Sequence, residues 1–511
     1  MGKVGDSVSV NKTNAATEVK TTAPKAEVKN TTTAPLNDSN SGANSKLSDV
    51  RTSSNSIKDR LQSFDGTKPA PAGFSTEATV TKTGGQVIID SGAGDDQIGV
   101  SQDQKTGNNT VTVNGEAQTF SGSDRDNIVI RAGDGNDNIW VDENVTVNLR
   151  LEGQNGDDFI RGGGGNDKIE GGDGNDRLHG GSGDDYINGS KGEDIIYGDK
   201  GNDVVYGGDG NDQLYGNDGN DYLEGSKGDD EIYGNDGNDI VSGGIGNDYL
   251  RGNYGDDVLY AGQGTDDVYG DDGNNKIYSQ ADDTIQASEG NVRNTVVTVE
   301  LKGNPGGTSV IINGSDEFRE RVEADLEMLR SSTTGRQMLE GYDEAFANNN
   351  VTVTINESSA NSGSASWANI GNPSAPQPYV DPATGTPGTP NSAEINYNPS
   401  YMPTYTYSDG TSTESIPTVV LFHEMAHAYD FTHGTFRNEE YTGTDNIDNG
   451  GGLRSGERVA VGLPIDNDNN ATTTEQTDNA VHPDNLTENG LREEFGMAQR
   501  EHYIGTGKSR V

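Results

Sequence analysis

The most regular pattern in the chain is a nine-residue period that runs without a slip through Gly153–Tyr278. Its eighth position is always aliphatic (Ile160–Ile277), and its fourth position is always glycine (Gly156–Gly273). A short run with one inward-facing aliphatic side chain is typical of a strand, and glycine supplies the left-handed backbone angles that a tight turn needs. We therefore predict a parallel β-roll over residues 151–280, in which two periods complete one coil.

Aspartate occupies the sixth position of every period except the last, which has Asn275. Carboxylates stacked at the strand spacing of about 4.8 Å repel one another unless cations lie between them. Calcium accepts several carboxylate and carbonyl oxygens in flexible geometry, whereas magnesium demands a tighter octahedron. Without calcium we expect this acidic segment to be disordered. The predicted calcium ligands are Asp158, Asp167, Asp176, Asp185, Asp194, Asp203, Asp212, Asp221, Asp230, Asp239, Asp248, Asp257 and Asp266.

Residues 76–150 show the same chemistry less regularly. Alternating runs at Thr110–Val113 and Val145–Leu149 predict strands. Single copies of the glycine and aspartate motif occur at Gly92–Ile98 and Gly133–Ile139. We interpret them as outlying copies of the repeat.

Residues 1–75 are rich in Ser, Thr, Asn, Lys and Ala, a composition that does not offset the entropy of folding. They are predicted to be a disordered tail, and an uncleaved export signal of the type III kind is an equally open interpretation. The N-terminus lacks the apolar stretch of a cleavable signal peptide, and no segment approaches the roughly 18 apolar residues of a membrane span.

Residues 290–511 have the composition of an ordinary mixed domain, for which we predict an α+β fold. Strands are expected at Val296–Val299, Ser309–Ile312 and Ile395–Tyr397. All candidate catalytic residues lie after the repeats, so we expect this half to fold and to act without the roll. One predicted helix has an apolar face made of Phe318, Val322, Leu326 and Leu329.

Composition narrows the choice of partners. The 511 residues carry a formal charge of −47, so phosphates would be repelled, and neither nucleic acid nor an anionic membrane is an expected partner. Only 29% of the residues are hydrophobic, which excludes one uniform core. Cysteine is absent, which excludes disulfides and thiolate zinc sites. We expect a monomer.

A second helix is predicted to begin at Pro417 and to continue through Tyr429. It contains a His-Glu-x-x-His motif, in which His423 and His427 are four residues apart and present both imidazoles to one metal ion. Zinc is the metal expected for this donor set. Glu424 is then placed to take the proton of the attacking water and to pass it to the leaving amine.

The residues alone leave the third zinc ligand open. His433 follows His423 by ten residues, the metzincin spacing, but Asp430 stands where that pattern has a glycine. A helix that continues through Phe431 would carry His433 away from the metal. The rival is Glu457, in a predicted helical segment that could pack against the first helix.

The repeats resemble the RTX (repeats-in-toxin) family, whose repeats form calcium-binding parallel β-rolls. The C-terminal half resembles the NleD-type bacterial effector zinc endopeptidases at Leu421–Tyr429, Glu457–Leu463 and Thr487–Gly496. An R-x-x-Y element, Arg500 to Tyr503, is similar to the one in clostridial neurotoxin light chains, which use His, His and Glu as zinc ligands.

These resemblances imply a zincin-like protease domain with Glu457 as the third ligand and with Arg500 and Tyr503 beside the developing oxyanion. They imply a secreted endopeptidase that acts on a protein, and the related effectors cut host signalling proteins. The alternative function is a calcium-dependent adhesion or surface-binding protein with an inactive protease-like domain. The intact Glu424 favours the enzyme. Type I and type III secretion both stay open.

Overall fold

The computed structural model describes residues 78–286, 294–299, 304–359, 364–367, 377–378, 387–399, 404–406, 412–433, 435 and 486–497. These residues all belong to one compact unit, Gly66–Val511. The predicted N-terminal tail and its export signal lie outside the described residues. No helix within the described ranges is long and apolar enough to span a membrane.

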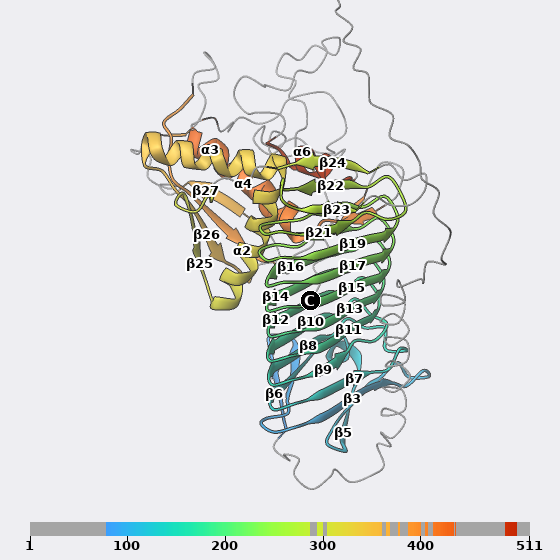
Figure 1. Ribbon diagram of the computed structural model, residues 1–511. Helices are drawn as coiled ribbons and strands as arrows, with labels where there is room; N and C mark the ends of the chain where they lie inside the picture. Colours follow the sequence, from blue (N-terminus) through green and yellow to red (C-terminus); the bar gives the residue numbers. More distant parts are fainter. Residues whose placement is uncertain are drawn as a thin grey trace, which may run out of the picture. The chain divides into compact units, whose positions relative to one another are not determined.

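The nonapeptide region forms a β-solenoid of two sheets, here called sheet A and sheet B, whose strands over residues 150–286 run parallel as successive rungs (Figure 1). Sheet A has the order β1 (Thr79–Thr83), β2 (Gln86–Asp90), β6 (Ile128–Asp134), β8 (Arg150–Asn155), β10 (Lys168–Asp173), β12 (Tyr186–Lys191), β14 (Val204–Asp209), β16 (Tyr222–Lys227), β18 (Ile240–Ser242), β20 (Val258–Tyr260), β22 (Lys276–Ser279) and β24 (Thr295–Thr298). Sheet B has the order β23 (Thr284–Gln286), β21 (Asp267–Tyr269), β19 (Tyr249–Tyr254), β17 (Glu231–Asp236), β15 (Gln213–Asp218), β13 (Ile195–Lys200), β11 (Arg177–Ser182), β9 (Phe159–Arg161), β7 (Asn138–Val141), β3 (Gln97–Gln102), β4 (Asn109–Val113) and β5 (Glu116–Phe120).

The register confirms the predicted β-roll with two periods per coil. In sheet B, Ile196 pairs with Leu214 and Leu214 with Ile232, always 18 residues apart. The aliphatic residue of each period is buried in one continuous core between the sheets. Glycine is required where successive turns touch: Gly219 has φ +149°, and a Cβ there would lie 1.5 Å from the carbonyl oxygen of Gly201.

The region before the repeats extends the roll, as the outlying motifs predict. The backbone N–H of Asp96 donates to the Asp137 carboxylate, and that of Asp137 donates to Asp158. A short 3₁₀ helix, η1 (Gly122–Asp124), follows the hairpin of β4 and β5. The predicted strand at Thr110–Val113 is present as part of β4.

The strand predicted at Val145–Leu149 is wrong. The segment has no strand structure, although Val145 and Leu149 are buried. Its backbone forms hydrogen bonds outside any strand ladder. Gly164 N–H donates to the Val145 carbonyl, and Leu149 N–H donates to the Asp167 carboxylate. The alternation of apolar residues therefore reflects inward-facing side chains on an irregular connection between β7 and β8.

The second half contains a smaller α/β region, as the fold prediction required. Its four-stranded sheet has the order β25 (Val310–Asn313), β26 (Val353–Glu357), β28 (Ala393–Tyr397) and β27 (Ser364–Trp367), with β27 antiparallel to β28. A two-stranded sheet joins β29 (Thr404–Thr406) and β30 (Ser412–Glu414). The described helices are α2 (Asp316–Ser331), α3 (Thr333–Asn349), α4 (Pro417–His433) and α6 (Glu488–Glu494).

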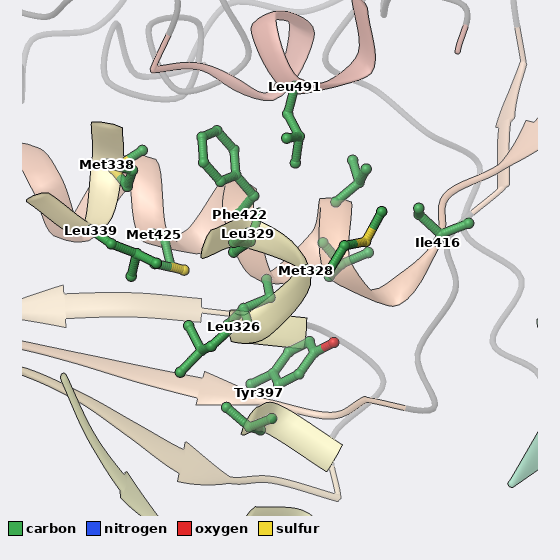
Figure 2. Packing of buried hydrophobic residues seen from close by; sticks show 14 of the residues in the cluster. Leu326, Met328, Leu329, Met338, Leu339, Tyr397, Ile416, Phe422, Met425 and Leu491 are labelled. Carbon is green, nitrogen blue, oxygen red and sulfur yellow. The ribbon is translucent and has the colours of Figure 1, made fainter. Parts of the chain in front are cut away.

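Helices α2, α3 and α4 bury their apolar side chains against one another and the sheet. Leu326 from α2, Met338 from α3, Phe422 from α4 and Leu491 from α6 belong to the same cluster (Figure 2). The predicted apolar face of α2 is confirmed, since its four residues are all buried. The helix begins where the Ser315 hydroxyl accepts from the Phe318 N–H at 3.1 Å.

The same hydrophobic cluster includes residues of the roll, which differs from the expected independence of the C-terminal half. Side chains on the outer face of sheet A, from β12 to β22, belong to one cluster with residues of α2, α4 and α6. The shared residues of the roll are Tyr186, Val204, Tyr206, Tyr222, Ile240, Val258, Tyr260 and Tyr278.

Candidate functional site

Helix α4 carries the His-Glu-x-x-His motif through the middle of the α/β core. It begins at Pro417, as predicted, and nearly all of its residues are buried, so packing rather than propensity sets its position. The Tyr342 hydroxyl of α3 donates to the Met425 carbonyl at 2.5 Å and fixes the helix at the motif itself.

The two motif histidines lie on one face of α4. The ring centroids of His423 and His427 are 4.9 Å apart and their planes are nearly perpendicular, at 87°. His427 and Glu424 are buried, while His423 is half-buried. Two neighbouring imidazoles beside a carboxylate form a donor set that suits zinc.

A carboxylate that the sequence did not single out contacts the first histidine. Glu488, at the start of α6, places its Oε2 atom 3.1 Å from His423 Nδ1, and its side chain is 1% exposed. Its other oxygen accepts from Arg492 Nε at 2.8 Å. The buried Arg492 also donates to the Ser415 hydroxyl, just before α4.

A carboxylate at this ion-pair distance is close enough to hold a metal-ligating imidazole in place. Helix α6 is held in place at its far end, because the Glu494 carboxylate accepts from the N–H groups of Thr333 and Thr334 at the start of α3. The sequence signal was the i, i+4 pair of Glu488 and Arg492, which an exposed helix also shows.

The contacts of His433 are with its own helix. Helix α4 continues as far as His433, whose ring stacks on Tyr429 with centroids 3.8 Å apart. Its Nδ1 atom lies 2.8 Å from the Tyr429 carbonyl oxygen. The other predicted site residues, Glu457, Arg500 and Tyr503, lie outside the described residues. Among the residues that the structure describes, no group of three His, Cys, Asp or Glu side chains is arranged to hold a metal ion.

The predicted calcium ligands form two ladders along the edges of the roll. Each carboxylate uses one oxygen to accept a backbone N–H from the preceding coil: Asp185 N–H donates to Asp203 at 2.7 Å, and Asp203 N–H donates to Asp221 at 2.8 Å. All of the predicted aspartates are buried. Asp167 differs from the others because its second oxygen accepts from Gly163 N–H.

The second oxygen of most ladder aspartates is buried without a hydrogen-bond partner, which is costly for an ionised carboxylate. It lies beside the glycine of its own turn: a Cβ at Gly198 would be 2.5 Å from Asp203 Oδ2. Aspartates in this environment are Asp158, Asp176, Asp194, Asp203, Asp212, Asp221, Asp230, Asp239, Asp248, Asp257 and Asp266.

Burial dominates the electrostatics of the ladder carboxylates. Burial, with the charges of Asp185 and Asp221 as smaller causes, raises the pKa of Asp203 to about 10. Burial also raises the pKa of Asp230 and Asp239 to about 9. Oxygen ligands of this kind, packed against glycine backbone, fit a hard cation such as calcium.

Comparison with known families identifies both halves. Residues 307–503 match the Peptidase_M91 family, described as an effector protein. Four copies of the RTX calcium-binding nonapeptide repeat match residues 152–187, 179–214, 215–250 and 242–277. The chain joins an RTX calcium-binding roll to a Peptidase_M91 domain. No curated protein matches it.

The two matches confirm the predicted combination and agree with the architecture. The Peptidase_M91 match points to a peptidase, and its range contains both α4 and α6. The RTX matches support calcium binding, and they cover the rungs from β8 to β22 where the aspartate ladders are most regular. Both families suggest a secreted protein.

We expect Asp203→Asn to weaken the response of the roll to calcium. The amide keeps the hydrogen bond from Asp185 but removes one charged ligand oxygen, and ligand charge sets calcium affinity. Circular dichroism of the full chain should show the calcium midpoint of the β signal moving several-fold higher. Asp184→Asn is the matched control, because Asn202 occupies the same repeat position one coil later. Equal midpoints for the two variants would contradict the assignment.

Proposed function

We propose that this protein is a secreted bacterial zinc-dependent endopeptidase, an effector or toxin that hydrolyses peptide bonds of a protein substrate. The observation that carries the proposal is the pair His423 and His427 on a buried helix, with Glu424 between them and the Glu488 carboxylate against His423. The Peptidase_M91 match to this region supports it.

Zinc held by His423, His427 and Glu457 would lower the pKa of a coordinated water to about 7 and so supply a nucleophile at neutral pH. Glu424, one residue after the first histidine, takes the proton of the attacking water and passes it to the leaving amine. Glu488 fixes the His423 ring through Nδ1.

Charge that develops on the substrate carbonyl needs donors, and the resemblance assigns this role to Arg500 and Tyr503. The helix geometry favours Glu457 over His433 as third ligand. His433 stays on α4 and uses Nδ1 on the Tyr429 carbonyl, so no turn of the chain brings it back toward His423.

The roll assists the export, folding or attachment of the enzyme outside the producing cell. Secretion is part of the proposal, and the substrate class includes host proteins by analogy with the effectors. The match to calcium-binding repeats supports this placement, because extracellular calcium modules bind at about 10⁻⁴–10⁻³ M.

Glu424→Gln tests the reaction. The amide cannot take a proton, and loss of a general base costs about 10²–10⁴ in rate, while bound zinc should stay unchanged. Cleavage of an unfolded protein by the zinc-loaded full chain measures the effect. If neither protein cleaves while the roll still binds calcium, the result contradicts the peptidase proposal and favours the adhesion alternative.

The zinc content of purified variants tests the ligand set. Glu457→Ala should lose zinc, because only two protein donors are left, whereas His433→Ala should keep it. Glu488→Gln should bind zinc about 10–100-fold more weakly, as expected for a carboxylate that orients a ligand. Mass spectrometry of the intact protein measures each. Zinc lost from His433→Ala but kept by Glu457→Ala would show that the metzincin spacing is the correct one.

A further inference from the structure

The outer face of sheet A changes character along the roll. On β8 and β10 it is charged, and ion pairs there join Arg150 to Glu152 and Glu170 and join Lys168 to Glu170. From β12 onward the same face contributes tyrosines and aliphatic residues to the core shared with the α/β region, beside polar residues such as the buried Glu224. The repeat sequence therefore encodes a docking platform on one stretch of one face.

Among the described residues, the outer face of sheet B shares no such core with the α/β region, although it also carries tyrosines. There Tyr197, Tyr215 and Tyr233 stack on one another, with centroids 4.9 and 5.1 Å apart and planes within about 10°. None of these three rings belongs to the shared cluster. Tyr215 and Tyr206 hold the same repeat position nine residues apart, so they differ mainly in the sheet to which they belong.

The platform bears a buried polar network as well as apolar contacts. Arg321 of α2 lies over the Tyr206 ring, and its Nε atom donates to the Tyr186 hydroxyl at 3.0 Å. The Tyr222 hydroxyl lies 3.0 Å from the hydroxyl of Thr418, the second residue of α4. The roll thus contacts the helix that carries the catalytic motif five residues before His423.

The network closes on Asp325, which is fully buried in α2. Its carboxylate accepts from the Thr418 hydroxyl at 2.6 Å and from the Tyr397 hydroxyl at 3.1 Å. Arg321 provides the countercharge at 3.5 Å. Removing the tyrosines of the roll would leave this ion pair with fewer partners, and a buried charge that loses its partners is strongly destabilising.

Helix α6, which supplies Glu488, also contacts the roll. Phe495, just after the helix, packs edge-on against Tyr260 with centroids 5.6 Å apart. Lys276 of β22 donates to the Glu494 carbonyl at 3.2 Å. Both helices that build the candidate site therefore rest on strands whose edges are the aspartate ladders.

We propose that the calcium-loaded roll is a structural part of the peptidase, so that calcium controls the order of α4 and α6 and thereby the activity. Without calcium the ladders repel, the strands separate, and the platform from Tyr186 to Tyr278 is lost. The helices then lose apolar cover and the Tyr222 contact to Thr418. The effect on activity rests on the proposed peptidase function, but the effect on helix order does not.

Hydrogen exchange of the full-length Glu424→Gln chain tests this coupling without relying on catalysis. Amides of α4 should lose protection when calcium is removed by dialysis into zinc-containing buffer, together with amides of roll strands such as β13. Magnesium at the same concentration is the control cation and should not restore protection. An α4 helix that stays protected while β13 exchanges freely would overturn the proposal.

In calcium, Tyr206→Ala should make α4 exchange on the order of 10²-fold faster, as expected for a large aromatic side chain removed from a core. Tyr215→Ala, the matched control on sheet B, should leave α4 unchanged. Tyr222→Phe removes only the hydroxyl next to Thr418 and should give a smaller increase with the roll intact.

Equal α4 exchange in Tyr206→Ala and Tyr215→Ala would also overturn the proposal. If Tyr206→Ala fails to fold, the exchange of α4 with and without calcium, and its exchange in Tyr222→Phe, still test the coupling. Suppose that α4 loses protection without calcium but the unsubstituted chain does not cleave a protein. This result would contradict the peptidase proposal and leave the structural coupling intact. Cleavage that is equal with and without calcium would contradict the structural coupling and leave the peptidase proposal intact.

Discussion

The structure depends on two stacks of buried carboxylates along the edges of the roll. Each ladder aspartate gives one oxygen to a backbone N–H of the preceding coil, and most keep the other buried and unpaired. Burial and like charges raise the pKa of these groups, so the folded ladder without cations favours protonated carboxyls. Calcium bound to the second oxygens would remove both penalties at once, because it would coordinate them and cancel the charge. The glycines of the turns leave the space in which this happens.

From this constraint the rest of the molecule follows in order. A roll with filled ladders holds its rungs in register, and register fixes which side chains face outward on sheet A. Those side chains form ion pairs on β8 and β10, whereas from β12 onward they include the tyrosines and aliphatic residues of the shared core. These residues share one core with α2, α4 and α6, and α4 and α6 place His423 against Glu488. The repulsion between buried carboxylates at the edge of the roll is thereby connected to the geometry of the His-Glu-x-x-His motif.

Much of this architecture could be predicted because the information is local. A nine-residue period specifies strand, turn and ladder within one repeat, and a four-residue spacing puts His423 and His427 on one helix face. The failures are all non-local. The alternation at Val145–Leu149 resembles a strand, but its backbone finds partners in Gly164 and Asp167 instead of a neighbouring strand.

The shared core was missed for a similar reason. An outward tyrosine such as Tyr206 looks the same in sequence as Tyr215, yet only one of them is covered by α2. Glu488 was missed because nothing near it in sequence reveals that α6 lies against His423. Contacts between different segments of the chain decide the structure of Val145–Leu149, the covering of Tyr206 and the position of Glu488. The pattern within one repeat does not predict such contacts.

Calorimetry of the full chain tests the central claim most directly. The account predicts one cooperative transition in calcium, in which the roll and the peptidase unfold together. In zinc-containing buffer without calcium, that transition should disappear or move to a much lower temperature. A peptidase transition that stays at the same temperature with and without calcium, beside a separate roll transition that responds to calcium, would contradict the account.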